Sequence, residues 1–157
     1  MATYRSSTAP ANGAAPGHGY AGEGLRTYGT YHFESAGPAA SDSVVLCRLP
    51  KGAVITGGKF FGGLMESTTS GATLDLDLGI ISGDTDTDAF GNLGVVVGAA
   101  KTGVQVETGY NYQFGGVLFS GGPLTLTKES ELGLTIVTSA TNYQSAWLSM
   151  FVDYKLP

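Results

Sequence analysis

Apolar residues recur at every second position in several short runs of this sequence, and glycine-rich breaks separate the runs. In residues 74–80 the even-numbered positions are leucine or isoleucine, whereas positions 75 and 77 are aspartate. Residues 146–154 carry an apolar side chain at every second position over their whole length. Successive side chains of a strand point to opposite faces, so each run predicts a strand with one apolar face. No stretch keeps the three- and four-residue spacing of a helix for three turns. The chain is therefore predicted to be all-β.

Ten strands are predicted, and turn-forming residues separate most of them. The strands span residues 25–34, 43–49, 53–61, 73–81, 93–97, 103–107, 116–119, 124–128, 131–138 and 146–154. The turns lie at residues 50–52, 62–63, 82–84, 91–92 and 121–123. Short strands with one apolar face each bury those faces by packing one sheet on another. We therefore predict an antiparallel two-sheet sandwich, and the pattern favours a jelly roll.

The first 24 residues differ from the rest because they are mostly Ala, Gly, Ser, Thr and Pro and show no apolar period. We divide the chain into an extended low-complexity N-terminal arm, residues 1–24, and a β-sandwich domain, residues 25–157. Fixing the backbone of 24 residues costs on the order of 25–50 kcal/mol, and this composition does not offset that cost within one chain. We therefore expect neighbouring subunits of an assembly to order the arm.

Charge and cysteine content exclude several classes of protein. Charged residues make up only 13% of the chain and its net charge is −5, which argues against a nucleic-acid partner. No apolar run approaches the ~20 residues of a membrane span, so we expect no membrane partner. Cys47 is the only cysteine, so no internal disulfide forms, and a reducing cytoplasm suits folding. In its apolar strand Cys47 is expected to be a small buried side chain.

The sequence contains no motif for cofactor binding or catalysis in the structural context that such a motif requires. Residues 17–22 match G-x-G-x-x-G, but they lie within the arm, with no strand before them and no helix after them. His18 and His32 are the only histidines; the first is in the arm and the second lies in a predicted strand. No G-x-S-x-G elbow is present. We predict no catalytic residue, no cofactor site and no metal site, and hence no enzyme.

Acidic residues concentrate between residues 60 and 100, where no Lys or Arg occurs. Within this stretch Asp84, Asp86 and Asp88 resemble the start of a calcium loop, because hard cations prefer several carboxylate oxygens. The sixth and twelfth positions of such a loop are here Ala89 and Val95 in place of Gly and Glu. Three interpretations stay open: a solvated acidic loop, a weak divalent-cation site, and a charge patch that faces a basic partner.

Aromatic residues point to contacts with other proteins. In the last predicted strand Trp147 and Phe151 lie on the face opposite the apolar row. They are expected either to line a subunit interface, where aromatic residues are enriched, or to belong to a strand buried on both faces. In and next to the arm, the side chains suited to anchor an interface are Tyr4, Arg5, Tyr20 and Arg26.

One segment carries a family resemblance. Residues 44–55 form a strand, a Leu-Pro-Lys-Gly-Ala turn and a second strand. Residues 76–80, 86–90 and the apolar strand 148–154 follow in that order. This order resembles the decoration, or cement, proteins that coat the capsids of tailed bacteriophages, over residues 43–154. The resemblance implies a jelly-roll or related sandwich that assembles as a dimer or trimer and clamps neighbouring capsid subunits. The long arm departs from the pattern.

The expected function is therefore binding itself. The resemblance implies a virion protein made in the host cytoplasm, placed on the capsid exterior, that binds the major capsid protein and itself. Buried apolar contacts would bridge capsid subunits against the pressure of packaged DNA. One alternative is a carbohydrate- or receptor-binding module of a fibre or tail. A second is a hydrolase, which needs a perturbed acid or base in a cleft.

Overall fold

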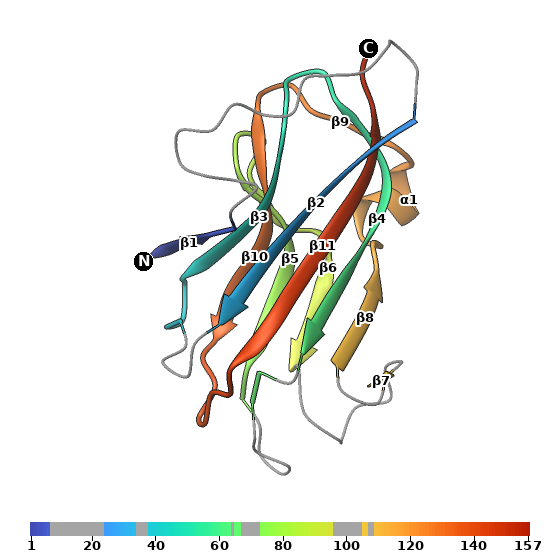
Figure 1. The fold of residues 1–157 in the computed structure, drawn as a ribbon. Coiled ribbons are helices and arrows are strands. Elements are labelled where there is room, and N and C mark those ends of the chain that lie inside the picture. The colour runs from blue at the N-terminus through green and yellow to red at the C-terminus, as the bar shows by residue number, and fades with distance from the viewer. Residues whose placement is uncertain (7–23, 34–37, 64, 67–72, 96–104, 107–108) are drawn as a thin grey trace.

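The computed structural model describes residues 1–6, 24–33, 38–63, 65–66, 73–95, 105–106 and 109–157. Two sheets pack face to face, one behind the other in the view of Figure 1. The five-stranded sheet has the order β1 (Thr3–Arg5), β3 (Ser43–Leu49), β10 (Ser130–Thr138), β5 (Asp75–Ser82) and β6 (Asp86–Val95). The six-stranded sheet has the order β2 (Gly24–Phe33), β11 (Ala146–Lys155), β4 (Val54–Gly63), β8 (Gly109–Gln113) and β7 (Gln105–Val106), with β9 (Leu124–Thr125) beside β4.

The order of the eight longer strands is that of a jelly roll. When β2, β3, β4, β5, β6, β8, β10 and β11 are numbered along the chain, the two sheets read 1-8-3-6 and 2-7-4-5. All pairings among these eight strands are antiparallel, and most connections cross from one sheet to the other. This arrangement is the double Greek key of the jelly roll. The predicted antiparallel sandwich is confirmed.

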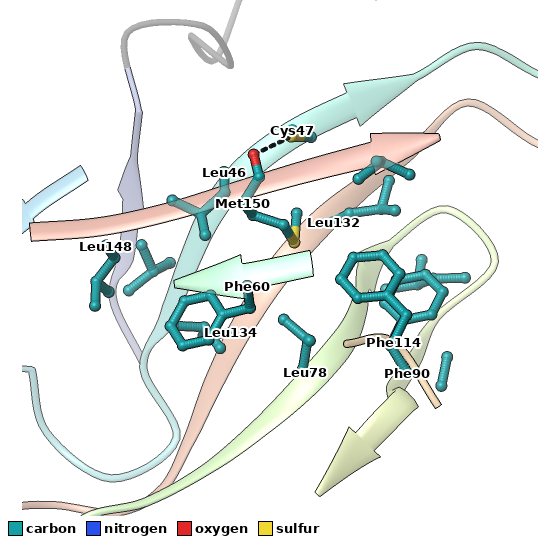
Figure 2. Close-up of a cluster of buried hydrophobic side chains, with 14 of the residues drawn as sticks. Leu46, Cys47, Phe60, Leu78, Phe90, Phe114, Leu132, Leu134, Leu148 and Met150 are labelled. Carbon is teal, nitrogen blue, oxygen red and sulfur yellow. Dashed lines mark hydrogen bonds between the residues drawn. The ribbon is translucent and has the colours of Figure 1, made fainter. Parts of the chain in front are cut away.

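The core lies between the sheets and is built from the alternating residues predicted above. Every apolar residue of the even-numbered row 74–80 is buried, as is the whole row from Ala146 to Tyr154. Figure 2 shows side chains of both sheets meeting there, among them Leu46, Phe60, Leu78, Leu134 and Met150. The Phe90 and Phe114 rings stack at 4.4 Å between centroids. Each fully buried Leu or Phe stabilises the fold by about 1.5–3 kcal/mol.

The acidic stretch forms a strand where the sequence predicted a loop. β6 begins at Asp86, whereas the predicted strand began at residue 93, and the turn expected at residues 91–92 lies inside β6. The physical reason is that β6 is an edge strand, so Asp86 and Asp88 stay exposed while Ala89 and Phe90 reach the core. Gly91 has φ 133°, where only glycine is unstrained, and pairing with β5 shifts register on both sides of it.

Two other predictions fail near glycines. The strand expected at residues 116–119 is instead the short helix α1 (Val117–Gly121). Gly116 has φ 56°, and a Cβ there would lie 2.4 Å from the Ala89 carbonyl oxygen, so only glycine lets the chain turn into α1. The turn expected at residues 62–63 lies inside β4, because Gly62 leaves room for the Phe60 ring, which would lie 3.1 Å from an added Cβ.

The N-terminal residues are ordered by their own domain. β1 pairs in parallel with β3, the Ser43 amide donates to the Ala2 carbonyl at 3.0 Å, and the Ser6 amide donates to the Val45 carbonyl at 2.9 Å. The expectation that only neighbouring subunits order the arm is therefore wrong for Thr3–Arg5. The rest of that expectation falls on residues 7–23, outside the described residues, and the domain boundary at residue 24 stays a prediction.

A charge network holds β1 in place. The buried carboxylate of Glu131 accepts two hydrogen bonds from Arg5, one from Arg48 at 2.5 Å and one from Ser82 at 3.0 Å. These four residues come from four strands of the five-stranded sheet. Burial alone raises the pKa of Glu131, but the hydrogen bonds from Arg5, Arg48 and Ser82 outweigh it and lower the pKa to about 2.

Replacing Glu131 by Gln is expected to change how stability depends on pH. The folded-state pKa lies below the ordinary value of 4.5, so the stabilisation is present above about pH 4.5 and is lost as the pH falls toward 2. The shift corresponds to roughly 3 kcal/mol. Urea unfolding from pH 7 to pH 2.5 is expected to show Glu131→Gln well below the wild type at pH 7 and close to it at pH 2.5. Glu129→Gln, at an exposed side chain, is the control. Parallel pH curves for wild type and Glu131→Gln would contradict the role of the network.

Candidate interaction surface

The outer face of the six-stranded sheet carries a cluster of aromatic side chains. We call this surface the aromatic face and define it by Tyr28, His32, Phe61, Trp147 and Phe151. They come from β2, β4 and β11, which lie side by side in Figure 1. Each alternates along its strand with residues that point into the core, so the buried core rows also fix the outward direction of the aromatic residues.

The register between β2 and β11 arranges the aromatic residues in rows. Trp147 lies opposite His32, and the two rings are 4.5 Å apart between centroids. Phe151 lies opposite Tyr28, four residues further along the strands. Phe61 of β4 extends the surface, with its ring 5.7 Å from that of Phe151. Contacts of this kind between neighbouring strands hold the rings in fixed positions.

Between the two aromatic rows lies a row that runs from the hydroxyls of Thr30 and Ser149 to the ring of Phe61. Ser149 is opposite Thr30 on one side and opposite Phe61 on the other. The aromatic rows on either side are four residues apart, or about 13 Å along a strand. The surface therefore places hydroxyl groups beside aromatic rings.

Three aromatic side chains of this face are among the exposed large apolar side chains of the protein. Tyr28 is 66% exposed, Trp147 63% and Phe61 36%. Among the described residues the other exposed large apolar side chains are Met1 and Val137, which lie elsewhere. Apolar side chains gathered on one face of a soluble protein mark an interaction site more often than singly scattered ones do. The face is thus the leading candidate for contact with a partner.

An ion pair lies at one end of the aromatic face. The guanidinium of Arg26 donates two hydrogen bonds to the carboxylate of Asp153, at 2.6 and 3.0 Å. Its carbon Cζ lies 4.2 Å from the centre of the Phe151 ring, within the range of a cation–π contact. The hydrogen bond to Asp153 raises the pKa of Arg26 further. This end of the face therefore presents a fixed, nearly neutral pair.

The structure brings three of the predicted interface residues together and separates the others. Arg26, Trp147 and Phe151 share the aromatic face, and the alternative of a strand buried on both faces is wrong for Trp147. Tyr4 and Arg5 belong to β1, where Tyr4 contacts the Tyr31 ring edge-on at 6.0 Å and Arg5 binds Glu131. Tyr20 lies outside the described residues. That any of them contacts a partner stays a prediction.

Three members of the face, Tyr28, His32 and Phe61, were not predicted from the sequence. The signal for Tyr28 was present, because residues 26, 28, 30 and 32 alternate with those that turn toward the core. Phe61 follows the buried Phe60 directly. Two adjacent phenylalanines do not tell from sequence which one points outward.

The acidic residues do not converge as a calcium loop requires. The Asp84 carboxylate accepts hydrogen bonds from the Thr127 hydroxyl at 2.6 Å and the Lys128 amide at 3.3 Å, and the bond from Thr127 lowers its pKa. Partial loss of hydration and the neighbouring Asp88 raise the pKa of Asp86, although its side chain is exposed. Within the described part of the chain, no group of three or more His, Cys, Asp or Glu side chains has an arrangement that could hold a metal ion. Asp86 and Asp88 are exposed, as the solvated-loop interpretation expected, but they lie in β6 and not in a loop. A basic partner for this side stays a prediction.

The other candidate groups have structural surroundings. Cys47 is buried against the Met150 carbonyl, 3.7 Å from its Sγ, as predicted, and burial raises the pKa of its thiol to about 12. His32 Nε2 lies 2.8 Å from the Ser145 hydroxyl. Of the two residues, Ser145 is exposed and His32 is half-buried. The G-x-G-x-x-G match at residues 17–22 lies outside the described residues.

No model of a known protein family matches the sequence, and a search of curated proteins finds no match. No helix within the described ranges is both long and apolar enough to cross a membrane.

Three solved structures share the fold. A chain of the cyanophage Pam1 capsid asymmetric unit is 21% identical with a TM-score of 0.69, over 95% of this chain and 96% of that one. A chain of the capsid of Ralstonia phage GP4 is 19% identical with a TM-score of 0.70, over 99% of both chains. A chain of the acidic stable capsid of Helicobacter pylori bacteriophage KHP30 is 14% identical with a TM-score of 0.53, over 86% and 93%. This chain therefore has a fold that occurs in phage capsids.

Proposed function

We propose that the protein is a structural component of a phage virion that binds the outside of the capsid and bridges neighbouring major capsid subunits. The observation that carries the proposal is the likeness in fold to chains of two phage capsids over 95% and 99% of this chain. Likeness over nearly the whole length supports a common architectural role, whereas a likeness confined to a few strands would not. We also propose that the protein has no enzymatic activity.

The sandwich has the properties that adhesion requires. Its core fills the space between the sheets, so the outer faces are held rigidly. Burying the exposed parts of Tyr28 and Trp147, on the order of 250 Å² together, contributes about 6 kcal/mol before the cost of association. Few such residues are needed for a specific contact, since a small number of aromatic side chains usually dominates the binding energy.

The charge of the chain supports an exterior location. The net charge is −5, and packaged DNA inside a capsid is strongly negative. A chain with an excess of acidic residues is repelled by DNA overall. The outside of the shell imposes no such repulsion.

The aromatic face also supports a second candidate, a module that binds carbohydrate or a receptor. Exposed rings next to hydroxyl groups suit sugars, which stack on rings and hydrogen-bond at their edges. Trp147 and Tyr28 flank Thr30 and Ser149 in this way. Binding of the purified protein to a glycan array would favour this candidate.

The proposal predicts saturable binding to capsids of the phage that encodes the chain. Capsids that lack the protein are expected to co-sediment with added protein up to a fixed copy number per capsid, and to resist heat better once it is bound. Cryo-microscopy of intact particles is expected to show the sandwich outside the shell at local symmetry axes. If the protein fails to bind the capsids, or lies inside them, the proposal is wrong.

A further inference from the structure

The outer face of the six-stranded sheet is hollowed where β4 bulges. Gly57 lies opposite Asp153, and Ile55 lies opposite Tyr154. Thr56 is therefore an extra residue between two paired positions, which is a β-bulge. Two open hollows adjoin at Thr56, with volumes of about 460 and 280 Å³. Residues of β2, β4 and β11 line the larger hollow, and residues of β4, β8 and α1 are among those that line the smaller one. We call the two hollows together the Gly57 groove.

Gly57 keeps the middle of the groove open, although the fold does not require glycine at this position. A Cβ added at Gly57 would have no described atom within 4 Å apart from its chain neighbours. Its φ lies outside the left-handed region, so the bulge does not demand glycine either. Gly58 differs, because a Cβ there would lie 2.5 Å from the Phe114 ring. A glycine inside a strand weakens the strand and often marks a place where another backbone approaches closely. Gly57 therefore points to a partner chain in the groove.

Lysines flank the groove on both sides. Lys59 lies two residues beyond Gly57 in β4, and Lys155 lies two residues beyond Asp153 in β11, at the other side of the groove. Among the described residues no carboxylate pairs with either lysine, and Asp153 is already bound to Arg26. The surroundings of the groove are therefore positively charged although the chain carries −5, and they suit a partner with carboxylates.

We propose that the Gly57 groove binds an extended, acidic segment of the major capsid protein. The inference rests on the proposed function, and it names the chemistry of the partner and the face that contacts it. The backbone of the segment passes over Gly57, and its carboxylates pair with Lys59 and Lys155. The exposed amide of Gln113, at the smaller hollow, donates and accepts hydrogen bonds, as a peptide backbone requires. The aromatic face adjoins the groove at Arg26 and adds apolar contact area.

Filling the groove tests the proposal. Gly57→Leu places a side chain in open space, so the fold is expected to stay intact, which circular dichroism and thermal unfolding check. Co-sedimentation with capsids that lack the protein is expected to show binding weakened roughly tenfold or more, because the segment and the leucine compete for the same space. Gly121→Leu is the matched control, since a Cβ at the exposed Gly121 likewise meets no described atom and Gly121 lines neither hollow. It is expected to bind like the wild type.

The same experiment separates this inference from the proposed function. If the wild type binds capsids and Gly57→Leu binds them equally well, the inference is wrong and the proposed function stands. If the wild type does not bind capsids, both are wrong.

Reversing the charge of one lysine tests the acidity of the partner. Lys59→Glu is expected to weaken capsid binding roughly tenfold at low salt, and added salt is expected to narrow this difference, because ions screen charges. Lys51→Glu makes the same change in net charge at an exposed turn residue that lines neither hollow, and is expected to bind nearly as well as the wild type. Equal losses in the two variants would mean that net charge alone acts, which contradicts the inference.

Cross-linking tests the location of the contact. The native Cys47 is buried, so a cysteine introduced at the exposed Thr56 is the accessible thiol. Thr56→Cys labelled with a benzophenone maleimide is expected to cross-link to the major capsid protein when coated capsids are illuminated. Val137→Cys, exposed on β10 of the other sheet, is expected to give at most a trace of that product. A product that joins two copies of this chain in place of the capsid protein, or equal yields for the two variants, would overturn the inference.

Discussion

The register of β11 is the constraint on which both faces of the six-stranded sheet depend. β11 pairs with β2 along its whole length and with β4 on its other side. Met150 and its even-numbered neighbours fill the core, while Trp147 and Phe151 point outward. A slip of one residue would exchange these rows, placing Trp147 in the core and Met150 in water. The apolar row therefore fixes the core and, at the same time, the surface offered to a partner.

Alternation could be read from the sequence because it is local. It located six of the eight longer strands, the inward rows and the outward face of Trp147 and Phe151. Contacts between distant residues left no such signal. The carboxylate of Glu66 is buried and accepts hydrogen bonds from the backbone amides of residues 73, 74 and 141, yet the sequence around it does not indicate these partners. The sequence around Gly116 likewise does not indicate that the Ala89 carbonyl lies against this glycine.

The N-terminal residues form the kind of contact that was predicted for them, but with a different partner. Arg5 was identified as an anchor from its type, and it is one, but it binds Glu131 of its own chain, 126 residues away. The entropic cost of ordering residues 1–24 was summed over the whole segment, whereas Thr3–Arg5 gains backbone pairing with β3 and a partly buried ion pair. A few residues can therefore be fixed to the domain even where the composition of the segment around them predicts none of it.

The two outer surfaces of the sandwich differ in chemistry. The outer face of the six-stranded sheet carries the exposed aromatic side chains, whereas the five-stranded sheet carries Asp75, Asp77 and the exposed aspartates of β6. An apolar surface associates with a partner by burial, and an acidic surface associates by charge complementarity. One buried core therefore holds two surfaces that suit different kinds of contact.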